Sequence, residues 1–254
     1  MLIVLGLVQG LCEFLPISSS GHLVLLSNLF GIEDSLFVSI ILHVATLLSI
    51  CVVLRKEIFA LIRHPFSSES MNIYIATIPT CLFALIFMSL INSSFEGSFL
   101  PFAFLISAVV LFAGEKLAKK DKYPWQSKER TIDSKKAFLI GVSQGIAIFP
   151  GISRSGMTIS TGLMLGADKS EVAKFSFLLS VPVILLSLVM EISKMVLFDY
   201  SISVSAIGIS LSFAVAFLVG ILSIKAMLSL TQKAKFKYFS LYLIIMAVIA
   251  FFVI

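Results

Sequence analysis

A polar loop between two apolar segments constrains this chain more than any other feature. Residues 150–158 read Pro-Gly-Ile-Ser-Arg-Ser-Gly-Met-Thr, and the segments on either side are apolar enough to be buried in lipid. Backbone polar groups at that depth find no water, so an irregular segment is tolerated only where protein encloses it or where it lines a wet cavity. Because a charged side chain there is costly, Arg154 indicates a site for an anion.

The same pattern occurs a second time near the start of the chain. Residues 5–10 (Leu-Gly-Leu-Val-Gln-Gly) and 16–21 (Pro-Ile-Ser-Ser-Ser-Gly) parallel residues 140–145 (Ile-Gly-Val-Ser-Gln-Gly) and 152–156 (Ile-Ser-Arg-Ser-Gly) at a constant offset, apart from a one-residue slip at the proline. We therefore interpret the chain as a duplication.

The two copies differ at positions that carry chemistry. Glu13 and His22 of the first copy match apolar residues in the second, whereas Arg154 of the second copy matches Ser19 of the first. Each half is therefore expected to contribute half of one site.

Composition places both copies in a membrane. Of the 254 residues, 59% are hydrophobic and 13% are charged, whereas soluble domains average about 45–50% apolar and about 25% charged residues. No stretch is polar enough to form a soluble domain. We predict a single membrane domain, residues 1–254, with a first repeat at about 1–114, a cytoplasmic linker at about 115–136 and a second repeat at about 137–254.

Six apolar segments are predicted to be transmembrane helices, because most are near the roughly 20 residues needed to cross a bilayer. They are residues 36–54, 71–91, 99–114, 175–197, 203–224 and 238–254. The segments that lead into the two polar loops, about 2–14 and 138–149, are shorter and are predicted to be re-entrant hairpins.

Positive charge orients these elements. Most of the 19 Lys and Arg residues lie in four linkers, whereas the linkers 28–35, 92–98 and 198–203 hold none. The positive-inside rule places the charged linkers in the cytoplasm and both termini outside. The prediction is an all-α polytopic membrane protein with two inverted-topology repeats, each a re-entrant helical hairpin plus three transmembrane helices. The basic inner linkers also explain the net charge of +5 without a nucleic acid partner.

The polar loops have the composition of an anion site. Serine and glycine at a helix start leave backbone N–H groups free to bind an anion, and a guanidinium is a planar, bidentate donor. A phosphate or diphosphate is the expected ligand. Its predicted binding residues are Arg154, Ser153, Ser155, Thr158, Gly156, Ser18, Ser20 and Gly21.

A nucleophile and a cation site are predicted beside that anion. Ser19, activated by His22 three residues later, is the candidate nucleophile. Glu13 and Gln9 lie four residues apart on one helix face and could hold a divalent cation, Mg²⁺ or Ca²⁺, through oxygen ligands. Alternatively, Glu13 orients or deprotonates His22.

Structural explanations exist for several of these residues. Serine and glycine often serve only close helix packing in membranes. His43, alone in an apolar segment, is interpreted as a satisfied core residue, and Glu191 with Lys194 as an ion pair. Arg154 and Glu13 could also pair only with each other.

At these positions the sequence resembles the undecaprenyl-diphosphate phosphatase family of the bacitracin-resistance type. The resemblance covers essentially the whole chain and depends on residues 9–22, 150–158 and 175–182. It implies a bacterial inner-membrane enzyme that hydrolyses undecaprenyl diphosphate to the monophosphate, recycles the lipid carrier of peptidoglycan synthesis and confers bacitracin resistance. It also implies a divalent cation, a homodimer and a site reached from the outer side.

The resemblance also assigns roles to residues of this chain. Gln9 and Glu13 would form the family's acidic metal-binding pair, Ser19 the nucleophile and His22 its partner, while Arg154 would grip the diphosphate. Two positions depart from the common pattern. Many members have Glu where this chain has Gln9, and many have Arg where it has Leu243.

A secondary transporter or a lipid flippase is the competing interpretation, because inverted repeats also occur in transporters. Transport requires no nucleophile, so Glu13, Ser19 and His22 favour the enzyme. A third, weaker interpretation is a packing module whose motif residues only join helices.

Overall fold

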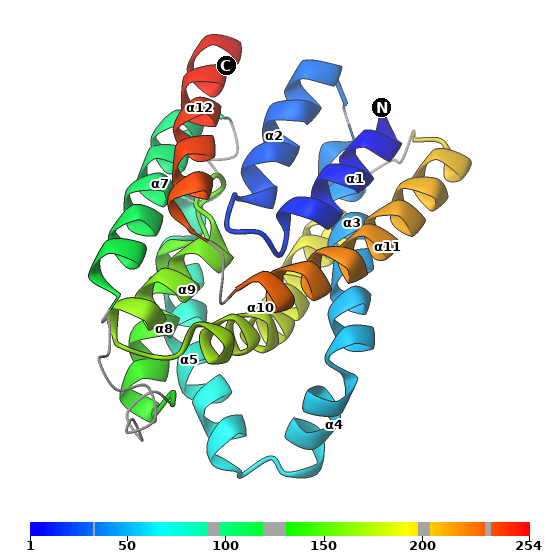
Figure 1. The fold of residues 1–254 in the computed structure, drawn as a ribbon. Coiled ribbons are helices and arrows are strands. Elements are labelled where there is room, and N and C mark those ends of the chain that lie inside the picture. Colours follow the sequence, from blue (N-terminus) through cyan, green and yellow to red (C-terminus); the bar gives the residue numbers. More distant parts are fainter. Residues whose placement is uncertain (33, 91–96, 119–130, 198–203, 232–234) are drawn as a thin grey trace.

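The computed structural model describes residues 1–32, 34–90, 97–118, 131–197, 204–231 and 235–254, and these residues form helices joined by short loops (Figure 1). Within them no strand occurs, so the all-α prediction is confirmed. The helices are α1 (Leu2–Cys12), α2 (Ser19–Phe30), α3 (Ser35–Val53), α4 (Arg55–Arg63), α5 (Ser68–Ile86), α7 (Leu100–Leu117), α8 (Ser134–Ile146), α9 (Arg154–Met164), α10 (Lys169–Leu197), α11 (Ala206–Leu230) and α12 (Lys237–Val253).

Each of the six predicted transmembrane segments contains a helix among its described residues, but these helices differ in how well each could span a bilayer alone. Four helices are long and apolar enough: α5, α7, the Lys169–Met190 part of α10 and the Ala206–Ser229 part of α11. A fifth span is formed only if the apolar part of α3 is counted together with α4, from which it is bent by 82°. The sixth, α12, is apolar but has 17 residues.

A short helix precedes each polar loop, as predicted. At about 1.5 Å per residue, α1 and α8, with 11 and 13 residues, extend only about 17 and 20 Å, less than the roughly 30 Å hydrocarbon core. Each is followed by a loop and a second short helix, α2 or α9, which packs against it. In Figure 1 the α1–α2 pair has both outer ends on the same side of the molecule. This arrangement fits a re-entrant hairpin.

The two halves pack against each other reciprocally. Helix α1 of the first half lies along α11 of the second, and α8 of the second lies along α5 of the first. Glycine permits both close approaches, since a Cβ at Gly6 would lie 2.3 Å from the Ser212 carbonyl oxygen and one at Gly141 would lie 2.1 Å from that of Ala76. The reciprocal arrangement is compatible with the predicted inverted repeats.

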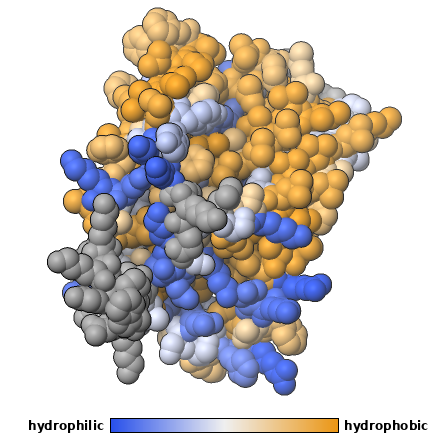
Figure 2. Space-filling view, in the orientation of Figure 1, coloured by the Kyte–Doolittle hydropathy of each residue, from blue (hydrophilic) through white to orange (hydrophobic). Residues whose placement is uncertain are grey.

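The two termini lie at the opposite end of the molecule from most of the hydrophilic side chains. The N- and C-termini lie at one end and α4 at the other (Figure 1), and hydrophilic side chains gather toward the α4 end (Figure 2). Large apolar side chains elsewhere on the surface, such as Val109 and Leu218, are more than half exposed, as expected of helices that face lipid. The orientation of these ends in a bilayer stays a prediction, and the predicted Glu191–Lys194 pair lies outside the described side chains.

Replacing Gly141 by alanine tests the close helix contact. Alanine raises helix propensity by about 1 kcal/mol, but the clash with the α5 backbone is expected to destabilise by about 1–3 kcal/mol, so the net change should be a loss. The midpoint of thermal unfolding in detergent measures it. Ala60→Val at an exposed position of α4 is the control, and a Gly141→Ala variant as stable as this control would contradict the packing.

Candidate active site

Each polar loop ends in a helix whose first turn is capped by its own serine. Ser18 caps α2 by accepting a hydrogen bond from the Gly21 N–H at 3.3 Å, and Ser153 caps α9 by accepting one from the Gly156 N–H at 3.1 Å. Ser18 also has a left-handed backbone with φ of 66°, which is uncommon outside glycine.

The tips of the two loops touch. The Ser155 hydroxyl donates to the Leu15 carbonyl oxygen at 3.0 Å, and the Gly151 N–H donates to the Ser20 hydroxyl at 3.4 Å. Gly21 lies so close to Gly151 that an added Cβ would meet the Gly151 Cα at 2.8 Å. The two polar loops therefore meet at one place, as predicted.

Glu13 is the centre of this junction. Its Oε1 accepts from Arg154 in an ion pair between the two halves. Its Oε2 accepts from the Ser19 hydroxyl at 2.6 Å and from Gln9 Nε2 at 3.0 Å. The Glu13 side chain is only 2% exposed, whereas that of Arg154 is 19% exposed. The structure thus brings together the guanidinium, the carboxylate and the hydroxyl that the sequence predicted to meet.

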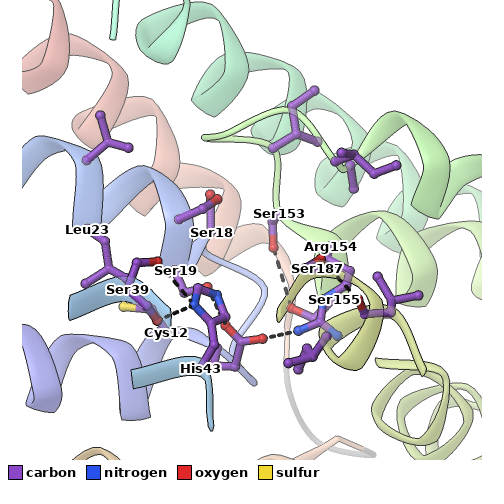
Figure 3. Close-up of a pocket in the computed structure, with 18 of the residues that line it drawn as sticks. Cys12, Ser18, Ser19, Leu23, Ser39, His43, Ser153, Arg154, Ser155 and Ser187 are labelled. Carbon is purple, nitrogen blue, oxygen red and sulfur yellow. Dashed lines mark hydrogen bonds and ion pairs between the residues drawn. The ribbon is translucent and has the colours of Figure 1, made fainter. Parts of the chain in front are cut away.

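A cavity of about 330 Å³ opens beside these groups. Figure 3 shows that residues of both loops line it, among them Ser19 from the first half and Arg154 from the second. The predicted site residues that line it are Glu13, Ser18, Ser19, Ser20, Ser153, Arg154 and Ser155. Gln9, Gly21, His22, Gly156 and Thr158 are not among its lining residues.

The cavity has a polar wall and an apolar wall. Helices α2 and α3 contribute mostly polar side chains to it, among them Ser27, Asn28, Ser35 and Ser39, together with the aliphatic Leu23 and Val24. The α8–α9 loop and α10 contribute mainly aliphatic side chains, namely Ala147, Ile148, Ile152, Val183, Ile184 and Leu188. Such a space suits a ligand with a polar head and an apolar tail.

Thr158 supports the site from behind. Its hydroxyl lies 3.0 Å from the carbonyl oxygen of Arg154, in the first turn of α9, and 2.6 Å from the hydroxyl of Ser176 on α10. Thr158 is completely buried. It therefore fixes the helix that carries Arg154.

The predicted pairing of His22 with Ser19 is wrong in this structure. His22 Nδ1 bonds to the Ser18 carbonyl oxygen at 2.7 Å, and Nε2 bonds to the Tyr242 hydroxyl at 2.7 Å. The two rings are also stacked, with centroids 5.7 Å apart. The bond to the carbonyl four residues earlier holds the imidazole against the start of α2, and the bond to Tyr242 directs it toward α12. The Ser19 hydroxyl instead donates to Glu13.

His43, interpreted from the sequence as a core residue, lines the cavity instead. Its Nε2 lies 3.9 Å from Glu13 Oε2, and its side chain is 21% exposed. The signal that could have revealed it is a polar stripe at four-residue spacing, Ser35, Ser39 and His43, on one face of an otherwise apolar helix.

The residues predicted to hold a divalent cation do not converge on one point. Gln9 turns Nε2 toward Glu13, and its Oε1 has no hydrogen-bond partner among the described residues. Thr46 fixes that amide: its hydroxyl lies within donating distance of two backbone carbonyls and within 3.4 Å of Gln9 Nε2. Both oxygens of Glu13 already accept from donors. Nor do the described residues contain a cluster of three His, Cys, Asp or Glu side chains suited to a metal.

Comparison with known proteins identifies the family. Residues 2–249 match the family described as bacitracin resistance protein BacA. The chain belongs to this family.

Curated relatives named undecaprenyl-diphosphatase cover nearly its whole length. One from Thermosipho africanus is 44% identical over 99% of this chain and 98% of its own. One from Carboxydothermus hydrogenoformans is 39% identical over 97% and 94%, and one from Christiangramia forsetii is 38% identical over 98% and 95%. Membership in the BacA family agrees with the resemblance found in the motifs.

The ion pair across the two halves can be tested by a double-mutant cycle. Arg154→Leu leaves the buried Glu13 carboxylate without its cation, which is expected to destabilise the protein by about 3–5 kcal/mol. Adding Glu13→Gln removes the unpaired charge and should restore much of that loss. Thermal unfolding in detergent measures all variants, and two single losses that simply add in the double variant would show that the residues do not interact.

Proposed function

We propose that this BacA-family protein is a membrane phosphatase. It hydrolyses undecaprenyl diphosphate to undecaprenyl phosphate and inorganic phosphate, and so recycles the lipid carrier for peptidoglycan synthesis and confers bacitracin resistance. The observation that carries the proposal is the meeting of Arg154, Glu13 and Ser19 in one cavity. The names of the full-length relatives support the same activity.

Arg154 and the two helix starts bind the diphosphate. Phosphate oxygens replace the Glu13 carboxylate as partners of the guanidinium, which can bind two of them at once. The Ser20, Ser153 and Ser155 side chains line the same space and supply further polar contacts. The apolar wall contacts the first isoprene units of the lipid. Negative charge that develops on the phosphoryl oxygens is then stabilised by groups already in place.

Ser19 is the nucleophile in this proposal, and Glu13 takes its proton. The hydroxyl already donates to Glu13 Oε2 at 2.6 Å. As the bond from Ser19 Oγ to the terminal phosphorus forms, the bond from phosphorus to the bridging oxygen breaks. The lipid monophosphate leaves and takes the proton from Glu13. Water then hydrolyses the phosphoserine and releases inorganic phosphate.

His22 becomes a positioning residue rather than the partner of Ser19. Its ring bonds to the carbonyl of the capping residue Ser18 and to Tyr242 of the last helix. Because Ser18 directly precedes the nucleophile, these contacts fix the start of α2. They also connect the site to α12, where many family members have Arg in place of Leu243.

A transporter or flippase would not need a hydroxyl bonded to a buried carboxylate. The assay that separates the two functions measures phosphate release from a polyprenyl diphosphate by the purified protein in detergent. Release supports the phosphatase. Uptake of the lipid into vesicles without phosphate release would support the transporter.

Ser19→Ala tests the nucleophile. We expect the turnover number to fall by three orders of magnitude or more while substrate binding stays nearly intact, because the lost group acts only in the reaction. Phosphate release and equilibrium binding of the lipid measure the two quantities. Ser223→Ala, at another buried serine that does not line the cavity, is the matched control. Substantial residual turnover in Ser19→Ala would rule out this nucleophile.

The divalent cation, Mg²⁺ or Ca²⁺, is proposed to arrive on the diphosphate oxygens rather than at a preformed protein site. Both Glu13 oxygens already accept from donors of the protein, and the Gln9 amide turns its nitrogen toward them, which supports this view. Calorimetric titration of the free protein with CaCl₂ should give no saturable binding at micromolar concentrations. After a methylene diphosphonate is added to the protein, the same titration should show saturable Ca²⁺ binding. Tight binding without the diphosphonate would contradict the proposal.

The protein is a multi-pass membrane protein. We propose further that it is a homodimer in the bacterial inner membrane, with both termini outside and the linker 115–136 in the cytoplasm. Separation of the termini from the α4 end supports this topology (Figure 1).

A further inference from the structure

A histidine that the proposed chemistry has not used faces the same reacting groups. His43 on α3 lines the cavity, and its Nε2 lies 3.9 Å from the oxygen of Glu13 to which the Ser19 hydroxyl is bonded. Figure 3 shows the imidazole beside Ser39, Ser19 and Cys12, on the side of the cavity opposite Arg154. No other histidine among the described residues lines this space.

The hydrogen bonds of His43 determine which of its nitrogens is free. Nδ1 lies 2.8 Å from the carbonyl oxygen of Ser39. A carbonyl oxygen can only accept, so Nδ1 carries the hydrogen. The Ser39 hydroxyl lies 3.2 Å from the same nitrogen. Because a hydroxyl oxygen can also accept from this N–H, the contact does not change the assignment. In the neutral ring, Nε2 is therefore an acceptor whose lone pair is available near Glu13.

Once Ser19 carries the phosphoryl group, its hydroxyl no longer donates to Glu13 Oε2, so that oxygen and His43 Nε2, 3.9 Å apart, define a place for one donor. His43 Nε2 and Glu13 Oε2 are too far apart for a hydrogen bond, and two acceptors cannot bond to each other. A molecule with two O–H groups, placed about 2.8 Å from each acceptor, can donate to both. Water has this property.

We propose that His43 and Glu13 together hold the water that hydrolyses the phosphoserine, an inference that rests on the proposed phosphatase function. The water oxygen has its remaining lone pairs free to attack the phosphorus on Ser19. Holding this water in line with the bond that breaks makes its attack on phosphorus effectively unimolecular, which lowers the barrier of the step. His43 acts by accepting a hydrogen bond, and Glu13 takes the proton.

The step balances without any further reactant. The water oxygen forms a bond to phosphorus, and the bond from phosphorus to Ser19 Oγ breaks. The proton that water loses goes to Glu13 Oε2 and from there to Ser19 Oγ, with which that oxygen shares a hydrogen bond before the reaction. Inorganic phosphate leaves, and Ser19 and Glu13 return to their starting forms.

This role predicts different behaviour for two substitutions of one residue. Glutamine at position 43 has a carbonyl oxygen that can accept from the water, whereas leucine fills similar space without an acceptor. His43→Leu should lower the turnover number by about 10²-fold, and the Michaelis constant should fall with it, because the phosphoserine accumulates when only its hydrolysis is slowed. His43→Gln should stay within about tenfold of the unchanged protein.

The test measures phosphate release from a polyprenyl diphosphate labelled in its terminal phosphate, with acid quenching to trap phosphate bound to protein. His43→Leu should accumulate labelled protein while it releases lipid monophosphate in a single burst. His64→Leu, in the exposed segment after α4, is the control for replacing a histidine. Thermal unfolding of each variant shows that it is folded.

Three results would overturn the inference. Turnover of His43→Leu close to that of the unchanged protein would show that the water does not need His43. Equal losses of turnover in the leucine and glutamine variants would show that the imidazole ring itself takes the proton from the water. A raised Michaelis constant with unchanged turnover would show a contact to the substrate instead. In each case the unchanged protein still releases phosphate, whereas its failure to do so would contradict the proposed function itself.

Discussion

The ion pair between Glu13 and Arg154 is the interaction on which the rest of the site depends. It joins the two halves of the chain at a place where neither charge is well exposed to water. A carboxylate that is 2% exposed requires a cation and hydrogen-bond donors to be stable as a charge. Arg154, Ser19 and Gln9 meet that requirement. A diphosphate can compete for the guanidinium because it is also an anion, so the pair that joins the two halves also holds Arg154 where the substrate binds.

Packing of the two halves explains why these residues meet. Helices α1 and α8 are too short to cross a bilayer, so the loops that follow them stay inside the protein. Gly6 and Gly141 allow each helix to lie against the backbone of the opposite half. Serine caps then fix the starts of α2 and α9, so that Ser19 and Arg154 approach Glu13 from two sides. The fold thus determines the positions of reactive groups that are separated by more than half of the chain.

The sequence predicted the fold class and the meeting of Glu13, Ser19 and Arg154, because charges and glycines in apolar surroundings have few explanations, whereas the inverted repeats stay a prediction with which the structure is compatible. It did not predict the partners of the histidines. His22 and Ser19 are three residues apart, but that spacing does not show whether an imidazole bonds to a neighbouring hydroxyl or to the carbonyl four residues earlier. His43 was assigned to the core because it stands alone in an apolar segment, and its distance from Glu13 depends on how α3 packs beside α1. Spacing within one helix cannot supply such a contact.

The most direct test of this account is a structure of the protein with an uncleavable polyprenyl methylene-diphosphonate. The account predicts that the terminal phosphoryl group lies between the Arg154 guanidinium and the Ser19 hydroxyl, with the lipid tail along Ile148, Ile184 and Leu188. A diphosphonate bound outside this cavity, with Arg154 and Glu13 still paired, would contradict it.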